Sequence, residues 1–517
     1  MIEGMTRRNN FEASSRARAL FRGISTSYAG TTINVVLNII ATPIILYALG
    51  ASRYGIWCIL LQVQSYFGML DFGLTIGSVR TLSISGVAHG RPDPGTLRHV
   101  LRLYMRISLL ILLVGPAVSL ALPHVLPIEN VRPVEVSTGF CVMTLGSALL
   151  MPLSTATDYL MAKQRLGLFN GLLLLRSVVE VGSGIGLVML GFGIVGLAVA
   201  QVLAGSIVYL VACQQMVKEY GWRVLWYAPN EPGVSQEVWQ ITKLTFLQKM
   251  SALVARNGDG VLIGFVLGPT AVTIYLLTFR LIATAVSLVG RATPLMLPGL
   301  SEVWGLGGAE RCNAIYRRVS RVIFVTLLAV GALAASLDRE FVSLWIGAGN
   351  CGSTILIWAL ASVAVLTTFG SVPQVILTSA NRLKTLTVGC AAEAALKVGL
   401  GLILLKVIGL SGLALASLVA WVIGCGMTGL GEVTKALKQP MLSLLWETMI
   451  GPGLLFGIPA ACVVVLAINW VATTWTGLMG KGFVMMLSLL ICGLLLEWRW
   501  GDWSYCYASV RGAPRKS

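Results

Sequence analysis

Long apolar runs separated by short polar connections make up most of this chain. A helix that crosses a membrane needs about 20 largely apolar residues, and fourteen stretches of the sequence meet this requirement. The pattern therefore predicts an all-α polytopic membrane protein. The predicted spans are residues 24–47, 54–85, 99–122, 136–160, 166–190, 193–216, 240–266, 270–300, 318–337, 354–380, 384–406, 411–433, 442–468 and 477–497.

The composition agrees with a membrane protein and excludes an ordinary soluble one. Of the 517 residues, 56% are hydrophobic and 11% are charged, whereas soluble domains have roughly 25% charged residues. The ten Cys include no Cys-x-x-Cys pair, and His89, His99 and His124 all fall in predicted loops. We therefore expect no disulfide framework, no metal site within the membrane and no cofactor.

The net charge of +17 indicates topology in a membrane protein, whereas in a soluble protein it would suggest nucleic acid as a partner. Most of the 38 Lys and Arg lie at the termini and on alternate connections. Because cytoplasmic connections are rich in Lys and Arg, both termini are predicted to be cytoplasmic, and span one is predicted to be an uncleaved signal-anchor helix. The basic residues predicted on the opposite side are Arg53, Arg132, Arg339, Lys406 and Lys481.

An internal repeat relates the two halves of the chain. Leu49-Gly50 before span two matches Leu267-Gly268 before span eight, and residues 193–200 match residues 409–416. The offsets of 218 and 216 are nearly equal, although small residues at four-residue spacing are also common wherever membrane helices pack. The repeat predicts two six-helix lobes with a pseudo-two-fold axis along the membrane normal, followed by two additional C-terminal helices.

These boundaries predict six segments along the chain, with no soluble domain. They are a cytoplasmic basic N-terminus (1–23), an N-lobe (24–216), a cytoplasmic inter-lobe linker (217–239), a C-lobe (240–433), two extra helices (434–497) and a cytoplasmic tail (498–517).

Two predicted spans each contain a pair of opposite charges spaced by four residues. Arg176 and Glu180 lie in span five, and Glu393 and Lys397 lie in span eleven. An offset of 217 maps one pair onto the other with the signs exchanged. Residues four apart share a helix face, so both pairs are predicted to be structural ion pairs.

Spans seven and eight contain further charges that their own helices do not neutralise. Lys249, Arg256 and Asp259 are spaced by seven and three residues, which places them on one helical face. Arg280 and Arg291 are eleven residues apart and also share a face. Arg256 and Arg280 are predicted to lie deep within their spans. Lys249 and Arg291 can alternatively extend to the cytoplasmic interface.

Spans one and two, the repeat equivalents of seven and eight, also have polar stripes. Asn34 and Asn38 lie on one face of span one, and Asp71 lies on span two with Arg80, which can also extend to the interface. With Asp71, the two Asn side chains are a possible sodium or proton site. The four helices are predicted to line a central water-filled cavity, and its excess of cations suits an anion such as phosphate.

Two segments resemble the Wzx-type polysaccharide flippases of the MOP (multidrug/oligosaccharidyl-lipid/polysaccharide) superfamily. The first contains Tyr54-Gly55-Ile56-Trp57, Gly68-Met69-Leu70-Asp71-Phe72-Gly73-Leu74 and Arg80. The second contains Asp259-Gly260-Val261-Leu262-Ile263-Gly264, Leu267-Gly268-Pro269 and Tyr275. The resemblance covers about residues 20–435.

The resemblance implies a bacterial inner-membrane flippase. Its substrate would be a polyprenyl-pyrophosphate-linked glycan, transferred from the cytoplasmic to the outer leaflet by alternating access. Asp71 and Asp259 would tune the cavity or respond to a coupling ion. The two extra helices depart from a minimal twelve-span flippase and are found in lipid II flippases, where they form a lipid-tail groove. The positions that match pyrophosphate-binding cations are Arg80, Arg256, Arg280 and Arg291.

Other functions are less compatible with the sequence. A cation-coupled drug exporter of the MATE type shares the architecture, but such a site should accept cations, and basic residues outnumber acids here. A membrane glycan polymerase, ligase or glycosyltransferase needs an acid–base site, usually on a large outer loop, and the outer loops are short. No phosphate-binding loop of the Gly-x-x-x-x-Gly-Lys-Ser/Thr type occurs, which argues against a primary pump. A secondary transporter is therefore expected, with membrane lipids, glycosyltransferases and a polymerase as partners.

Overall fold

The computed structural model describes residues 30, 32–71, 74–87, 92–128, 131–227, 250–380, 382 and 384–499, and these residues form helices and no strands. Twelve of the described helices are long and apolar enough to cross a membrane, and a bent helix pair makes thirteen if it is counted as one span. The remaining predicted span, residues 54–85, is divided into shorter helices. The predicted all-α polytopic fold is confirmed.

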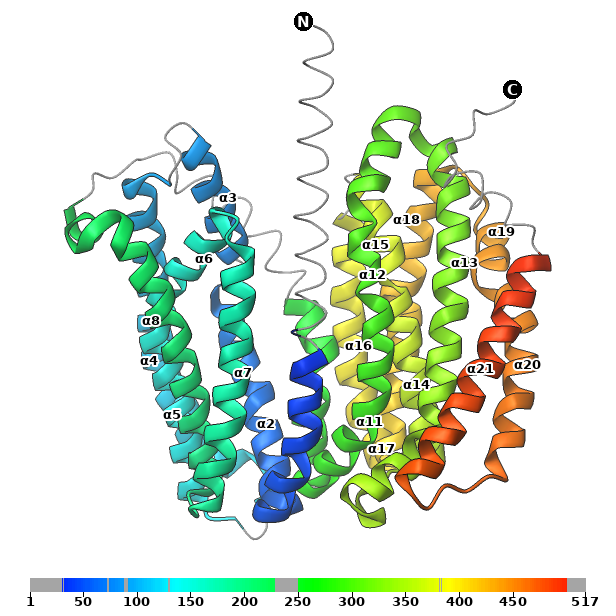
Figure 1. The fold of residues 1–517 in the computed structure, drawn as a ribbon, viewed down its shortest axis with the longest axis horizontal. Coiled ribbons are helices and arrows are strands. Elements are labelled where there is room, and N and C mark those ends of the chain that lie inside the picture. The colour runs from blue at the N-terminus through cyan, green and yellow to red at the C-terminus, as the bar shows by residue number, and fades with distance from the viewer. Residues whose placement is uncertain are drawn as a thin grey trace, which may run out of the picture. The chain divides into compact units, whose positions relative to one another are not determined.

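The chain divides into two compact units, of which the first comprises Met1–Leu253 and Gly268–Thr270. It is drawn in blue to green in Figure 1. Its elements are the helix Thr32–Leu49, α2 (Ala51–Gly68), η1 (Met69–Asp71), α3 (Leu74–Val87), α4 (Pro94–Val125), α5 (Pro133–Leu150), η2 (Met151–Leu153), α6 (Ser154–Ala162), α7 (Leu166–Met189) and α8 (Gly193–Tyr227).

Two spans of this unit are interrupted by short 3-10 turns. Span two changes from α2 to α3 after η1, and span four changes from α5 to α6 through η2. Pro152 in η2 has no backbone N–H and so cannot continue the α-helical hydrogen-bond pattern. Both turns pack against α4, which places the two interruptions beside one neighbouring helix. The prediction of one continuous helix over residues 54–85 is therefore wrong.

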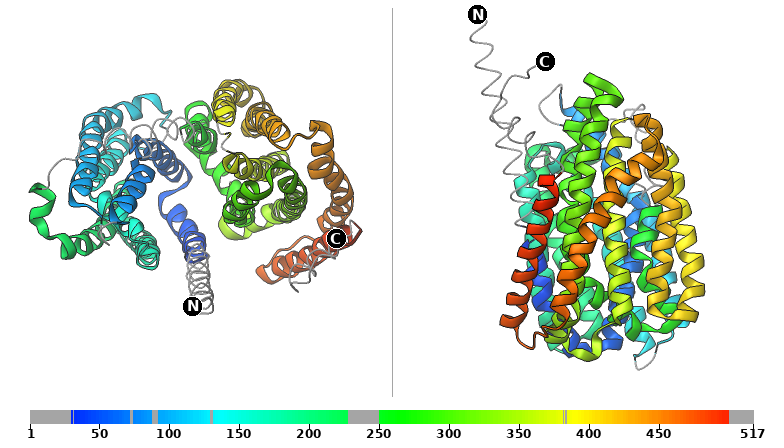
Figure 2. Two further views of the ribbon diagram at one scale, coloured as in Figure 1. Left: turned by 90° about the horizontal axis from the view of Figure 1, so that it is seen from above. Right: turned by 90° about the vertical axis from the view of Figure 1, so that its right-hand side faces the viewer.

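The second unit comprises Val254–Leu267 and Ala271–Ser517. In Figure 2, α20 and α21 lie side by side, and both pack against α13. Its elements are α10 (Asp259–Leu267), α11 (Pro269–Gly290), α12 (Ala292–Leu295), α13 (Leu297–Ile346), η3 (Ala348–Asn350), α14 (Thr354–Phe369), α15 (Ser371–Ser379), α16 (Lys384–Ile408), α17 (Leu410–Trp421), η4 (Val422–Gly426), α18 (Met427–Leu437), α19 (Met441–Leu445), η5 (Trp446–Ile450), α20 (Gly451–Ile468) and α21 (Trp475–Arg499).

The predicted repeat recurs in the backbone geometry of its glycines. Gly50 and Gly268, which end the matched Leu-Gly pairs, have φ of 79° and 86°. Gly193 and Gly409, which open the second matched segment, have φ of 56° and 70°. Positive φ is accessible to Gly without the steric cost that Cβ imposes. Both repeats therefore need Gly at the start of the matched helices.

Two predicted connections are helical instead. Helix α13 has 50 residues and continues through the predicted connection at residues 301–317. Helix α8 continues into the predicted linker as far as Tyr227, with a kink at Gly221, where φ is 68°. Residues 228–249 lie outside the described residues, as do 1–29 and 500–517, which include the predicted basic N-terminus and most of the tail.

Large apolar side chains are exposed on helices of both units. Examples are Leu113, Met189 and Leu210 in the first unit and Ile403 and Leu466 in the second. Soluble monomers rarely expose large contiguous apolar areas, whereas lipid tails favour them, and all backbone groups within a helix are internally hydrogen-bonded. The protein is therefore a multi-pass membrane protein.

A buried ion pair joins α21 to α13. The ammonium group of Lys481 lies 2.6 Å from Oε1 of Glu340, and the Lys481 side chain is almost fully buried. We expect Lys481→Ala to lower the free energy of unfolding by about 1–3 kcal/mol, because a charged hydrogen bond is lost and Glu340 keeps its charge. The thermal unfolding midpoint in detergent measures this, with the exposed Lys406→Ala as the control. Equal midpoints for both variants would contradict the assignment.

Candidate functional site

The buried carboxylate of Asp158 links three helices of the first unit through hydrogen bonds. The Asp158 side chain on α6 accepts hydrogen bonds from the hydroxyl groups of Tyr104 on α4, at 2.7 Å, and of Ser78 on α3. The Tyr104 hydroxyl also lies 3.2 Å from that of Thr75. Sequence reasoning missed Asp158 because it lies near the predicted end of span four, where an acid was assigned to the membrane surface.

Removing this carboxylate should destabilise the first unit. Asp158→Ala removes the carboxylate that both hydroxyls share and leaves them with Thr75 as their partner, so we expect a loss of about 1–3 kcal/mol in the free energy of unfolding. Tyr104→Phe removes one donor only and should cost less. Unfolding midpoints of the two purified variants check the order, and an Asp158→Ala protein as stable as the wild type would contradict it.

A polar cavity of about 250 Å³ adjoins both interrupted spans of the first unit. Gly68 and Thr75 line it from either side of the α2–α3 interruption, and Met151 and Ser154 line it from the α5–α6 interruption. Helices α7 and α8 complete the wall. Their contributions are Arg176, Gln201, Val202, Gly205 and Tyr209. Interrupted helices commonly border binding sites in transporters.

Arg176, one member of a predicted ion pair, lines this cavity, and its contact with Glu180 is present. Nε of Arg176 lies 3.6 Å from Oε2 of Glu180, and the two side chains are 37% and 35% exposed. The two side chains are therefore in contact, and each is more exposed than the side chains of a buried ion pair.

The polar stripe of span one contacts α7. The side-chain amide of Asn38 donates to Oδ1 of Asn34 at 2.7 Å, and the amide of Asn34 donates to the Ser177 hydroxyl at 2.6 Å. Thr42 continues the stripe by donating to the Asn38 carbonyl. The stripe thus packs within the first unit, next to Arg176. The Asp71 side chain lies outside the described residues, so the predicted ion site is untested.

Span seven is bent between Arg256 and Asp259, two of the charged residues predicted to lie on one face of a continuous helix. The helix Met250–Asn257 and α10 meet at an angle of 48°. Arg256 before the bend is exposed, and Asp259 after it is buried. Gly258 interrupts the helix between these two residues, so the predicted continuous helix is bent here. Lys249 lies outside the described residues.

Asp259 is held by residues of two other helices. Its Oδ1 lies 2.6 Å from the ammonium group of Lys397 on α16, and its Oδ2 accepts from the Tyr275 hydroxyl of α11 at 2.9 Å. Lys397 also donates to the backbone carbonyl of Ala255. The Lys397 and Asp259 side chains are only 5% and 12% exposed. The predicted ion pair of Lys397 with Glu393 is therefore wrong: its short contact is with Asp259.

Glu393 is buried one helical turn before Lys397. It lies within electrostatic reach of Lys397 and of Arg256, and its backbone is packed closely against Gly424 of η4. Two acids and two bases thus form one network in the second unit. Its acids and Lys397 are buried, and Arg256 is its exposed member.

The other predicted cations occupy separate positions. Arg280 is half-buried in α11, and Arg291 is exposed directly after the end of that helix. Arg80 is exposed on α3 in the first unit. Among the described residues, neither Arg80 nor Arg291 has an ion-pair partner.

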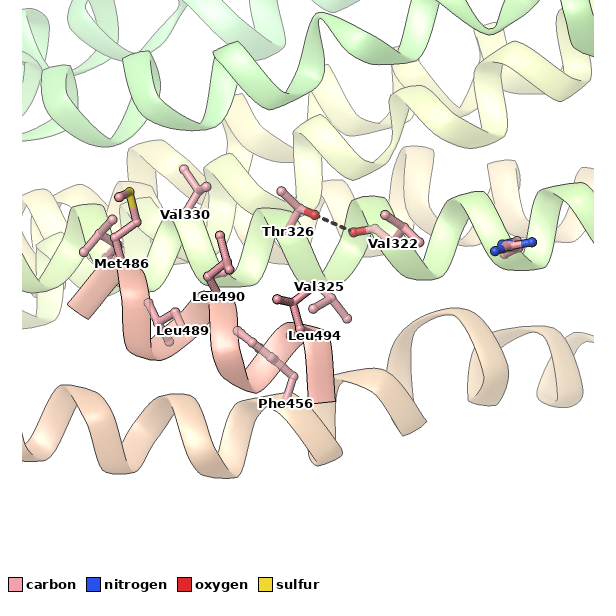
Figure 3. A pocket seen from close by; sticks show the side chains of 13 residues that line it. Val322, Val325, Thr326, Val330, Phe456, Met486, Leu489, Leu490 and Leu494 are labelled. Atoms are coloured by element: carbon pink, nitrogen blue, oxygen red, sulfur yellow. Dashed lines mark hydrogen bonds between the residues drawn. The ribbon is translucent and has the colours of Figure 1, made fainter. Parts of the chain in front are cut away.

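An apolar groove lies between α13, α20 and α21. Figure 3 shows Val322, Val325 and Val330 of α13 facing Leu489 and Leu490 of α21. Phe456 of α20 closes the groove, and Arg318 of α13 is its charged lining residue. The cavity volume is about 450 Å³. Sequence analysis assigned two extra helices to this region but did not identify the lining residues.

A protein-family model and solved structures provide comparisons for this architecture. The model described as "Polysaccharide biosynthesis protein" matches residues 154–353, a range that contains Arg176, Arg256, Asp259, Arg280 and Arg291. No curated protein sequence matches the chain.

Solved transporters have a similar fold at low sequence identity. Lipid II flippase MurJ in an inward closed conformation has a TM-score of 0.67 and 11% identity, covering 92% of this chain and 99% of MurJ. An inward-facing multidrug resistance MATE family transporter of the MOP superfamily has a TM-score of 0.62 and 17% identity, covering 78% of this chain and 96% of that transporter. These similarities show that the chain shares the fold of these transporters, and the family model links residues 154–353 to polysaccharide biosynthesis proteins.

Proposed function

Because this chain has the fold of the MOP superfamily, we propose that it is a flippase for polyprenyl-pyrophosphate-linked oligosaccharide. It transfers the glycan from the cytoplasmic to the outer leaflet by alternating access and contains no catalytic residue. It lies in a bacterial inner membrane with both termini cytoplasmic, and it receives its substrate from glycosyltransferases and delivers it to a polymerase. Polysaccharide biosynthesis, the description of the matching family model, supports this assignment.

The exposure of Arg256 is the observation that carries the proposal. Its network contains equal numbers of acids and bases, but Asp259 and Glu393 are buried while the Arg256 guanidinium is accessible. The accessible charge is therefore positive. A guanidinium group can bind two phosphate oxygens at once, so this position suits a pyrophosphate. Arg280, Arg291 and Arg80 are the further pyrophosphate-binding cations in the proposal.

The apolar groove supports a substrate with a polyprenyl tail. Its wall consists mainly of branched aliphatic side chains, and Arg318 is the charged exception. A branched isoprenoid chain can fill such a groove without burying unpaired polar groups of the protein. Lys481 and Glu340 fasten α21 to the helix that forms the other side of this groove.

Transfer of lipid II is a second candidate. Lipid II also has a polyprenyl pyrophosphate, and the similarity to MurJ spans 92% of this chain, compared with 78% for the MATE transporter. The two substrates differ in what their loss does to a cell. Deletion of a lipid II flippase should block wall synthesis, whereas deletion of a polysaccharide flippase should remove surface polysaccharide and leave the cell wall intact.

A deletion strain separates these functions from drug export. We expect loss of surface polysaccharide, accumulation of lipid-linked glycan with its sugar on the cytoplasmic side, and unchanged susceptibility to organic cations. Plasmid-borne wild-type protein is the control and should restore the polysaccharide. Normal polysaccharide together with increased susceptibility to organic cations would contradict the flippase and favour a MATE-type exporter.

A further inference from the structure

The two charge pairs related by the repeat have different environments. Lys397 in the second unit is buried against Asp259, so that its charge is compensated within the protein. Arg176, in the corresponding pair of the first unit, is 37% exposed and lines a cavity. Under the repeat, Arg176 corresponds to Glu393, which is buried, so the equivalent position is closed in the second unit and open to a cavity in the first. A purely structural role of Arg176 would not require its exposure to a cavity.

The cavity wall contains polar groups that a ligand can engage. The Oε1 atom of Gln201 is buried and has no hydrogen-bond donor among the described residues. An unpaired buried carbonyl costs free energy, so a hydrogen-bond donor at this place would be stabilised. The Ser154 and Tyr209 hydroxyls line the same cavity, and each can donate and accept.

The charge of the wall selects against the pyrophosphate. Arg176 is partnered by Glu180, so the pair adds no net charge and gives little attraction for a dianion. The ion pair uses Nε of Arg176, and the terminal Nη groups remain able to donate to neutral oxygens. Apolar side chains, Phe67 and Met143 among them, form the rest of the wall. A neutral ligand with several hydroxyls and apolar C–H faces matches this surface.

We propose that this cavity binds a sugar ring of the glycan head group, through hydrogen bonds from Arg176 and to Gln201. This inference rests on the proposed function, since it names the part of the lipid-linked substrate that the first unit holds. The volume of about 250 Å³ is below the usual range of about 300–1,000 Å³ for ligand pockets, and it suits a single ring rather than a whole oligosaccharide. The pyrophosphate is bound elsewhere, by the exposed guanidinium groups.

Two soluble ligands test whether the sugar and the pyrophosphate bind at different sites. The first is the free oligosaccharide released by mild acid from the lipid-linked glycan of the producing cells, and the second is farnesyl pyrophosphate, which has no sugar. Isothermal titration measures the binding of each fragment to the purified protein in nanodiscs. Gln201→Leu should weaken oligosaccharide binding roughly tenfold and leave farnesyl pyrophosphate binding unchanged.

Matched variants distinguish a binding effect from a folding effect. Gln214 lies exposed on the same helix outside the cavity, and Gln214→Leu should bind both fragments like the wild type. Retained binding of farnesyl pyrophosphate shows that Gln201→Leu is folded. If it does not fold, Ser154→Ala replaces it, with an expected loss of about threefold for the oligosaccharide alone.

The outcomes separate this inference from the proposed function. Oligosaccharide binding that is equal in the wild type and Gln201→Leu would overturn the sugar site. A wild-type protein that binds farnesyl pyrophosphate but not the oligosaccharide would also overturn the sugar site, with the proposed function intact. A wild type that binds neither fragment would overturn the proposed function itself.

Discussion

Arg256→Ala should abolish glycan translocation while leaving the amount of folded protein unchanged. The side chain is exposed before the bend of span seven, so its removal leaves no cavity in the protein. Loss of a bidentate charge-assisted contact costs about 1.5–3 kcal/mol for each hydrogen bond, which corresponds to a decrease of roughly 100-fold or more. Surface polysaccharide in a complemented deletion strain measures the effect, and immunoblotting of the membrane fraction measures the amount of protein.

Two further substitutions sharpen this prediction. Arg256→Lys keeps the charge but loses the bidentate geometry, so we expect partial activity. Arg106→Ala removes an exposed cation of α4 that the proposal does not use, and it should export normally. Arg280→Ala should resemble Arg256→Ala. Normal export by both alanine variants at Arg256 and Arg280 would show that these cations do not bind the substrate.

Lys397→Ala should be the most destabilising substitution among those considered. It leaves Asp259 as a buried charge with only the Tyr275 hydroxyl as a hydrogen-bond partner. Breaking one side of a buried ion pair costs about 3–5 kcal/mol. The thermal unfolding midpoint of protein purified in detergent measures this loss, and little folded Lys397→Ala protein is expected at the growth temperature.

The equivalent pair of the first unit provides the control. Arg176 and Glu180 are each about one-third exposed, and an ion pair of this kind contributes about 0–1 kcal/mol. Arg176→Ala should therefore have nearly wild-type stability. In the second unit, replacing both Lys397 and Asp259 with apolar residues should be less damaging than replacing Lys397 alone. A Lys397→Ala protein as stable as Arg176→Ala would contradict a buried ionic contact.

The membrane fold could be predicted because length and hydropathy alone determine whether a helix can span a bilayer. The repeat was also visible, since Gly50 and Gly268 meet the same positive-φ requirement in both halves and so preserve a sequence signal. The interruptions in spans two and four were not visible. Hydropathy averaged over a span does not report where the α-helical hydrogen bonds stop, although Pro152 in η2 was an available signal.

The partners of the charged residues depended on tertiary structure. Spacing by four residues on one helix correctly predicted the contact of Arg176 with Glu180. It gave Lys397 the wrong partner, since the short contact to Asp259 joins two helices that are far apart in sequence. Gly258 was the available signal that the helix breaks between Arg256 and Asp259, because glycine weakens a helix.

Translocation by the purified protein in proteoliposomes tests the proposed function most directly. Vesicles contain lipid-linked oligosaccharide, and an impermeant periodate reagent reports how much glycan is on the outer face. The wild type is predicted to move glycan from the inner to the outer face, where the reagent oxidises it. Vesicles with Arg256→Ala are predicted to behave like protein-free vesicles. Glycan exposure no faster with the wild type than in protein-free vesicles would contradict the account.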